Sequence, residues 1–181
     1  SLEPDYVEEL YTDKRYRKII SHRNYNPRLI RYVTDSNRLS NCTPAEYWPY
    51  AKDLFDNPAK VWENPFEAQH DDFGRALILL VTLNRRPIAQ SELSESYARF
   101  IAHLDAKSMH GRRDYLQSLR HLVGSMLTRT VTDEREPLIN LFNPSIGDFV
   151  LRRYASDTPS LRAGFSSLRS TSSLRTLFDL E

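Results

Sequence analysis

The sequence predicts a mainly α-helical fold that contains one small β-hairpin. Three observations lead to this prediction. Apolar residues recur at helical spacing through most of the chain. Several of these stretches begin with an asparagine or threonine followed by proline, at 26–27, 43–44, 57–58 and 143–144, which is typical of a helix start. Two short stretches, 125–131 and 138–142, have strand composition and flank a polar turn.

The composition sets limits on the class of protein. The chain has 181 residues, is 40% hydrophobic and carries a net charge of +1, so one or two domains fit and bulk charge predicts no partner. Cys42 is the single cysteine, which excludes a disulfide framework and favours a reducing, cytoplasmic location. The longest apolar run, 76–83, is far shorter than the about 20 residues of a membrane span, and no signal peptide is expected.

The first 70 residues predict a bundle of short helices. We expect one helix over about 5–20 and a second over 27–34. A third begins at Thr43, where Thr-Pro-Ala-Glu forms a capping box. A fourth begins at Asn57-Pro58, and Pro65 is expected to bend or end it. We therefore assign 1–70 to one helical domain.

The start of the second helix lies in a basic stretch. Asn26 is a good N-cap, Pro27 occupies the first helical position, and Arg28 is expected to point outward beside the positive helix end, which suits contact with a phosphate. An ordinary capped helix with a solvated arginine explains the same residues. Seven cations and no acid lie between positions 14 and 31, which indicates a solvated face, or a surface that meets phosphate or an acidic domain: Lys14, Arg15, Arg17, Lys18, Arg23, Arg28 and Arg31. The acidic stretch 46–72 is a candidate partner within the chain.

The second domain is predicted to span 71–156. Helices are expected over 72–84, from Ser91 onward and over 114–123, with Leu116 and Val123 among the inward positions of the last. The β-hairpin follows them. Three helices and then a hairpin is the order of a winged helix. Asn143 caps a further helix, and the tail 157–181 predicts one or two helices, or the start of a following region.

Motifs in both domains resemble a known family. Tyr25-Asn26-Pro27-Arg28-Leu29-Ile30 in the first domain is followed by Asn57-Pro58 and Trp62, and the second domain closes with the segment 138–150, LINLFNPSIGDFV. Together they resemble the region that follows the P-loop domain in bacterial novel STAND NTPases, over residues 5 to 165. The resemblance implies an AAA+/STAND lid-like helical bundle followed by a winged helix.

The resemblance also implies a function. The chain would be a non-catalytic regulatory module that senses the nucleotide state and holds or releases an inactive conformation. Its partner would be an upstream P-loop NTPase domain of the same chain, and that domain would bind ATP or ADP with Mg²⁺, while this part alone would bind no cofactor. Asn26, Pro27 and Arg28 match the lid element that contacts the nucleotide, with Arg28 at the γ-phosphate. Asn143 matches a histidine that contacts the diphosphate, although asparagine is not a cationic phosphate ligand.

Two other functions fit parts of the sequence. A DNA-binding winged helix would use Arg112, Arg113 and Arg120 around its third helix, but acids in the hairpin turn oppose the approach of phosphate, so we expect no nucleic acid as partner. A protein-interaction adaptor would use the Leu/Phe stripe of the tail, by oligomerisation or by binding another protein. We expect no enzyme, because the chain has no P-loop pattern, no metal-binding motif and no spaced set of nucleophile, base and acid.

Overall fold

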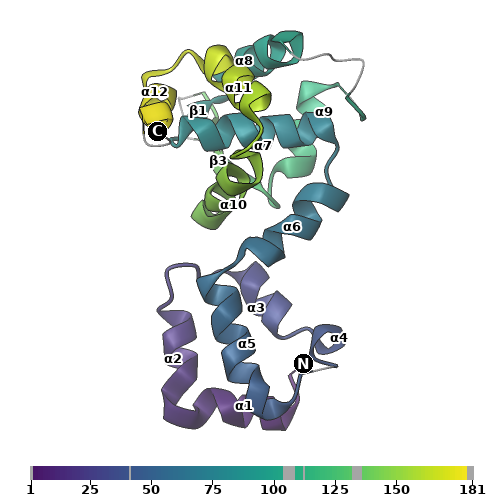
Figure 1. The fold of residues 1–181 in the computed structure, drawn as a ribbon, viewed down its shortest axis with the longest axis vertical. Coiled ribbons are helices and arrows are strands. Elements are labelled where there is room, and N and C mark those ends of the chain that lie inside the picture. The colour runs from purple at the N-terminus through teal and green to yellow at the C-terminus, as the bar shows by residue number, and fades with distance from the viewer. Residues whose placement is uncertain (1, 41, 104–108, 112, 132–135, 179–181) are drawn as a thin grey trace. The chain divides into compact units, whose positions relative to one another are not determined.

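The computed structural model describes all residues except 1, 41, 104–108, 112, 132–135 and 179–181. The chain is mainly helical with a small antiparallel sheet, as the sequence predicted (Figure 1). It divides into two compact units, unit 1 over Ser1–Asn64 and unit 2 over Pro65–Glu181. Among the helices of the described residues, none combines the length and the apolar character that a bilayer crossing requires.

Unit 1 begins with two helices where the sequence predicted one. Helix α1 (Pro4–Tyr11) is separated from α2 (Arg15–Ile20) by a 3-10 turn, η1 (Thr12–Lys14). Asp13 and Lys14 adopt left-handed backbone angles, with φ of 48° and 54°. This break turns the chain so that α1 and α2 both pack against α5 (Pro44–Asp56), which a continuous helix would not allow.

The remaining helix starts of unit 1 follow the sequence prediction closely. Helix α3 spans Pro27–Val33, and Asn26 caps it. Thr43 and Glu46 form the expected capping box of α5, in which Glu46 Oε2 accepts from the Thr43 N–H at 3.0 Å. A short helix, α4 (Ser36–Leu39), was not predicted. The unit is held by one apolar core of buried side chains: Ile19, Leu29, Val33, Leu39, Tyr47, Ala51, Leu54, Phe55 and Val61.

Helix α6 (Ala59–Ala68) contains the boundary between the two units. Of the two effects expected of Pro65, ending the helix was wrong, since the helix continues to Ala68 and the Gln69 N–H donates to the Pro65 carbonyl at 3.3 Å. A proline removes only its own N–H and leaves its carbonyl available. Phe66, directly after the proline, is buried in unit 2 with its ring 5.4 Å from that of Phe149.

Unit 2 is built around α7 (Asp72–Asn84), in which almost every side chain is buried. The chain continues through β1 (Ile88–Ala89), α8 (Gln90–His103), α9 (Tyr115–Leu122), β2 (Leu127–Thr130) and β3 (Leu138–Leu141). β3 lies in the middle of the sheet and is antiparallel to both neighbours, with Ile139 opposite Ile88 and opposite Arg129. The hairpin was predicted, whereas β1 was not, because its two residues are too few to show alternation.

Helix α9 buries a narrower face than the sequence predicted. Leu119 and Leu122 are buried as expected, but Leu116 is 51% exposed and Val123 is 37% exposed. Val123 already has extended backbone angles, and Gly124 follows with φ of 86° and donates its N–H to the Leu127 carbonyl at 2.8 Å. The helix therefore ends one residue early, and its first turn leaves an apolar side chain in solvent.

Three further helices complete unit 2: α10 (Pro144–Tyr154), α11 (Thr158–Leu168) and α12 (Thr171–Phe178). Helix α11 packs on α7 and α8 with Gly164 at the contact, where an added Cβ would lie 2.5 Å from Leu83 Cδ1. Helix α12 packs against α7 through its polar side and exposes its apolar side, with Phe178 73% exposed. The tail is thus helical, as predicted, and belongs to unit 2 by its contacts.

Candidate functional site

The start of α3 is fixed by a chain of buried asparagines. Asn26 Oδ1 accepts from the Leu29 N–H at 3.0 Å, and Asn26 Nδ2 donates to the Asn24 carbonyl at 2.9 Å. Asn24 Nδ2 in turn donates to the Phe55 carbonyl at 2.8 Å, at the end of α5. Both asparagines are buried, so these bonds are shielded from water. The loop between α2 and α3 is therefore tied rigidly to the unit 1 core, and Pro27 begins the helix directly after it.

Arg28 does not point into solvent as the sequence predicted. Its guanidinium carbon lies 5.3 Å from the centre of the fully buried Trp62 ring, which is within the range of a cation–π interaction. Burial lowers the pKa of Arg28 from its usual value, but a guanidinium remains charged at neutral pH. The structure thus holds a half-buried positive charge, oriented by an aromatic ring, beside the N-terminus of α3.

An imidazole and a carboxylate lie close to this helix start. His22 Nε2 is 3.2 Å from Asp56 Oδ1, and the Lys52 ammonium donates to Asp56 Oδ2 at 2.6 Å. The Asn24 N–H donates to His22 Nδ1, which fits a neutral imidazole that carries its proton on Nε2. The hydrogen bonds from Lys52 and then from His22 lower the pKa of Asp56. The His22–Asp56 contact joins the loop before α3 to α5. Within the described residues, however, Lys14, Arg17, Lys18 and Arg23 form no ion pair, so these cations do not show the predicted pairing with the acidic stretch.

Asn143 belongs to unit 2, where it caps α10. Its Oδ1 accepts from the N–H of Ser145 at 2.9 Å and from the hydroxyl of Ser145 at 2.6 Å. The residue is 7% exposed. The side-chain acceptor is therefore engaged within the helix start, and only the amide nitrogen remains for a ligand.

The three arginines considered for DNA contact are placed as follows. Arg112 lies outside the described residues. Arg113 and Arg120 are exposed, one just before α9 and the other on it. Gln117 and His121 share the exposed side of this helix, so α9 presents polar and basic groups together with Leu116.

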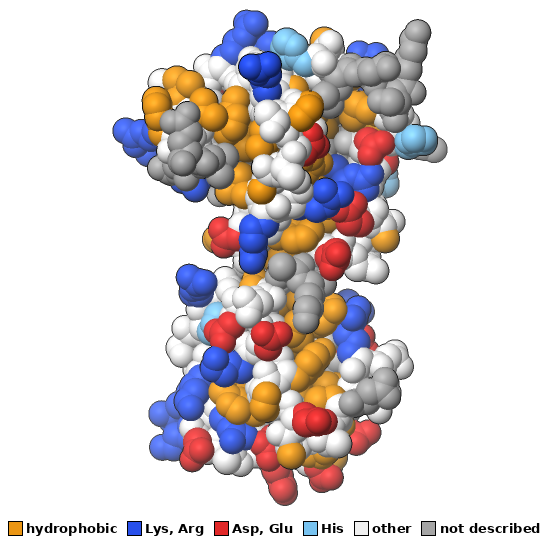
Figure 2. Space-filling view, in the orientation of Figure 1, with side chains coloured by type: hydrophobic (Ala, Val, Ile, Leu, Met, Phe, Trp, Pro, Cys, Tyr) orange, Lys and Arg blue, Asp and Glu red, His pale blue; other side chains and the backbone are white. Residues whose placement is uncertain are grey.

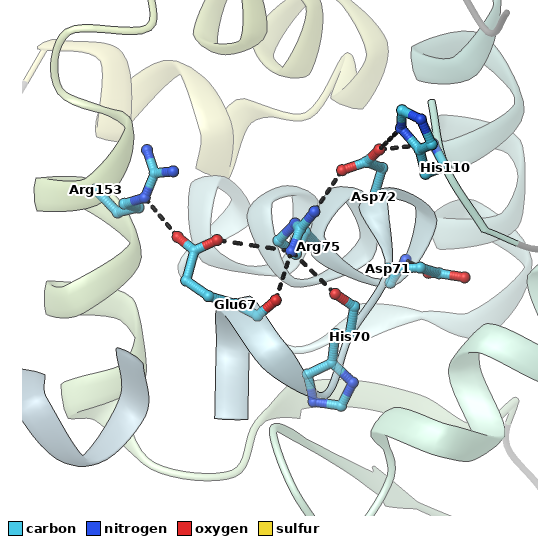
Figure 3. Close-up of polar contacts among 8 residues, drawn as sticks. Glu67, His70, Asp71, Asp72, Arg75, His110 and Arg153 are labelled. Atoms are coloured by element: carbon cyan, nitrogen blue, oxygen red, sulfur yellow. Dashed lines mark hydrogen bonds and ion pairs between the residues drawn. The ribbon is translucent and has the colours of Figure 1, made fainter. Parts of the chain in front are cut away.

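A polar network that the sequence did not reveal surrounds the start of α7 (Figure 3). Arg75 Nη1 donates to the carbonyls of Glu67 and His70 at 3.1 and 3.0 Å, and Arg75 Nη2 contacts Asp72 Oδ1 at 2.5 Å. Arg153 Nε on α10 donates to Glu67 Oε1 at 2.6 Å. The spacing of Asp72 and Arg75 could have indicated their pairing. Arg153 is 86 residues from Glu67, and nothing local indicates that bond.

The loop before α9 docks onto the same helix start. The His110 N–H donates to Asp72 Oδ2 at 2.7 Å, and the Asp72 N–H donates to the His110 carbonyl at 3.1 Å. Gly111 has φ of 124°, and a Cβ at this position would lie 2.1 Å from Asp71 Oδ2. Asp71 and Asp72 are thus structural groups at the start of α7, where the helix dipole favours acids.

A cleft of about 440 Å³ adjoins this network. Asp71 lines this cleft, and Asp71 Oδ1 accepts from the Gly74 N–H at 2.8 Å. Among the described residues, no group of three or more His, Cys, Asp or Glu side chains could hold a metal ion. The cleft is lined by Gln69, His70, Asp71, Gly74, Gln117, Ser118, His121 and Leu122.

Comparison with known proteins gives no family and no relative: no protein-family model, no curated protein and no solved structure matches this chain. A function therefore has to be inferred from the residues and from their arrangement.

Proposed function

We propose that this chain is a non-catalytic regulatory module of a STAND-type P-loop ATPase, with unit 1 as the lid and unit 2 as the winged helix. The strongest support for the proposal is the order of helices and strands in unit 2. The order α7, β1, α8, α9, β2, β3, with β3 central in an antiparallel sheet, is the order of a winged helix. A separate helical unit precedes it, which agrees with the family's order of lid and winged helix.

The proposed mechanism centres on Arg28. The asparagine chain fixes the start of α3, and Trp62 holds the guanidinium at a set orientation. A rigidly placed cation discriminates strongly between ATP and ADP, because the γ-phosphate adds negative charge that disappears on hydrolysis. In this proposal ATP and Mg²⁺ are bound by a P-loop domain of the same chain, and the lid closes when Arg28 meets the γ-phosphate.

Asn143 has a smaller part in this mechanism than Arg28. Its oxygen is engaged by Ser145, so a diphosphate contact would involve Asn143 Nδ2 alone. A neutral amide contributes less to phosphate binding than a cation. The loss of Asn143 would therefore act mainly on the stability of unit 2.

The test needs the longer protein that carries the P-loop domain. The coding sequence upstream of Ser1 should contain a strand followed by G-x-x-x-x-G-K-[ST]. In that protein, Arg28→Gln is expected to weaken ATP binding at least tenfold relative to ADP, while Arg31→Gln, on the exposed side of α3, leaves both affinities unchanged. The proposal is wrong if no such motif precedes Ser1, or if Arg28→Gln leaves ATP affinity, hydrolysis and activation intact.

DNA binding through α9 is the second candidate function, and the exposed side of that helix favours it. Gln117, Arg120 and His121 face solvent together, as readers of a major groove would. Glu136, beside the hairpin turn, opposes phosphate, and it accepts from the Ser91 N–H at 2.6 Å. A mobility shift with duplex DNA at near-physiological salt would support this candidate if Arg120→Ala abolished it.

The adaptor function has weaker support. The tail helices α11 and α12 both pack on α7, so they are not free to wrap around a partner. The adaptor function is supported by an exposed apolar stripe on α12, formed by Leu174, Leu177 and Phe178.

A further inference from the structure

The surface around α2 carries cations that the chain itself does not neutralise. Within the part of the chain that the structure describes, Lys14, Arg17, Lys18 and Arg23 form no ion pair. All four side chains are exposed. Figure 2 shows Lys and Arg side chains gathered over α2, with side chains of the hydrophobic class between them. We call these four residues, together with Tyr11, Tyr16 and Tyr25, the α2 surface.

Aromatic rings accompany the cations on this surface. Tyr11 is 69% exposed and Tyr25 is 45% exposed, so much of each side chain is accessible to a ligand. The rings of Tyr11 and Tyr16 lie 5.4 Å apart, which brings the end of α1 onto α2. Arg17 lies 6.0 Å from the centre of the Tyr16 ring. Tyr11 therefore lies beside the ring that Arg17 contacts, and Tyr25 follows Arg23 by two residues.

The backbone fixes this arrangement. The left-handed residues Asp13 and Lys14 turn the chain between α1 and α2, and Tyr11 lies beside Tyr16 across this turn. Lys18 Nζ lies 5.7 Å from the centre of the Trp48 ring on α5, which anchors one side of α2. On the loop that follows, the Tyr25 N–H donates to the His22 carbonyl at 2.8 Å. Cations and rings are thus presented by ordered backbone.

We propose that the α2 surface binds single-stranded nucleic acid. Phosphates would contact Arg17, Lys18 and Arg23, and bases would stack on Tyr11 and Tyr25. Single-strand binding needs this combination, because every base has a flat face that stacks on an aromatic ring and the cations follow the backbone. This surface is distinct from α9 and from Arg28, so the inference is independent of the proposed function.

Other polyanions fit the surface less well. A membrane would need a larger apolar face. Among the large hydrophobic residues in the described part of unit 1, Ile20 is the one aliphatic side chain that is exposed. Duplex DNA hides its base faces in the stack, so the exposed tyrosines would find no partner. Asp13, exposed in η1 between Tyr11 and Lys14, borders the surface and limits it to a short strand. A short, local site agrees with the chain's net charge of +1.

The first experiment is a binding titration of the whole chain with fluorescein-labelled oligo-dT and oligo-U of about 12 nucleotides, followed by anisotropy. Each phosphate contact contributes about −0.7 to the slope of log K against log salt for a single strand. The three contacting cations therefore predict a slope of about −2.1 between about 50 and 200 mM salt. Absence of binding at the lower salt concentration overturns the proposal.

Matched variants locate the site. Arg17→Ala/Arg23→Ala is expected to weaken binding at least tenfold and to make the slope shallower by about 1.4. Arg113→Ala/Arg120→Ala removes the same charge from α9 and should change neither quantity. If the α9 variant loses binding and the α2 variant keeps it, the nucleic-acid surface is α9 and the proposal is wrong.

The tyrosines distinguish base stacking from simple attraction of charge. Tyr25→Ala and Tyr11→Ala should each weaken oligonucleotide binding about five- to hundredfold with an unchanged salt slope. Binding of heparin, which has no bases, should not respond to either substitution, and Phe178→Ala on α12 should leave both ligands unaffected. If the tyrosine variants bind the oligonucleotides as wild type does, or if the chain binds phosphatidylserine vesicles and no oligonucleotide, the surface is not a single-strand site.

Discussion

Asp72 and Arg75, in the first turn of α7, face each other with 2.5 Å between Oδ1 and Nη2. Arg75 also donates to the carbonyls of Glu67 and His70, so one side chain ties the end of α6 and the connecting residues to α7. Asp72 accepts from the His110 N–H and so holds the loop before α9. The pair therefore organises three segments that meet at the start of the most buried helix of unit 2.

Loss of Arg75 is expected to destabilise unit 2. Arg75→Ala removes charge-assisted hydrogen bonds from a side chain that is 22% exposed, and we expect a loss of about 2–3 kcal/mol in the free energy of unfolding. Urea unfolding followed by far-UV circular dichroism measures it. Tryptophan fluorescence reports on unit 1 separately, because Trp48 and Trp62 both lie there.

Arg152→Ala serves as the control for this substitution. Arg152 is exposed, and its Nε donates to the Asp148 carbonyl of its own helix. Its loss should change the stability by less than about 0.5 kcal/mol. Equal effects of the two substitutions would show that the network around Arg75 contributes little.

The stability of unit 2 should fall in acid because of Asp72. Burial raises the pKa of this carboxyl, but the hydrogen bonds from the His110 N–H and from Arg75 outweigh that effect and lower the pKa below its usual 3.8. Because the pKa is lower in the folded state, the ionised carboxylate stabilises the fold at pH values above the unfolded-state pKa. This stabilisation is lost as the pH falls through the folded-state pKa. Asp72→Asn should therefore be less stable than wild type at neutral pH and lose less stability below about pH 4. Urea midpoints between neutral pH and pH 3 measure both slopes, and parallel slopes would contradict the assignment.

Local hydrogen bonds explain what the sequence predicted well. The caps at Asn26 and Asn143 and the capping box of Thr43 each join residues two to three positions apart, so a short stretch of sequence contains both partners. The hairpin was equally readable, because two strand-like runs flank one polar turn.

The features that sequence reasoning missed depend on distant residues. Strand β1 exists because Ile88 pairs with Ile139, and two residues alone give no periodic signal. Arg28 was expected in solvent because its partner ring, Trp62, belongs to another helix. The break at Asp13 has a similar origin, since α1 and α2 both pack on α5 and tertiary packing overrides a continuous helical pattern.

Removal of the cap at Asn26 is expected to destabilise unit 1. Asn26→Ala deletes the acceptor of the Leu29 N–H and the donor to the buried Asn24 carbonyl, so it should cost more than the about 0.5–2 kcal/mol of an ordinary N-cap. Tryptophan fluorescence during urea unfolding follows it. Asn37→Ala, at an exposed position of α4, should stay within about 0.5 kcal/mol of wild type. A loss for Asn26→Ala no larger than that for Asn37→Ala would mean that the asparagine chain is not a rigid support for Arg28.

Two helical glycines of unit 2 should respond in opposite directions to alanine. At Gly74 an added Cβ meets ordinary contacts, with Asp71 Oδ1 nearest at 3.4 Å, so Gly74→Ala should stabilise by up to about 1 kcal/mol through helix propensity. At Gly164 the Cβ would lie 2.5 Å from Cδ1 of the fully buried Leu83, and overpacking should cost about 1–3 kcal/mol, which exceeds the propensity gain. Thermal unfolding followed by circular dichroism compares the two variants directly.

Since both substitutions add one methyl group to a helix, propensity is common to both, and the difference in melting temperature reports the packing of α11 on α7. Stabilisation by Gly164→Ala equal to that by Gly74→Ala would mean that α11 does not pack closely on α7.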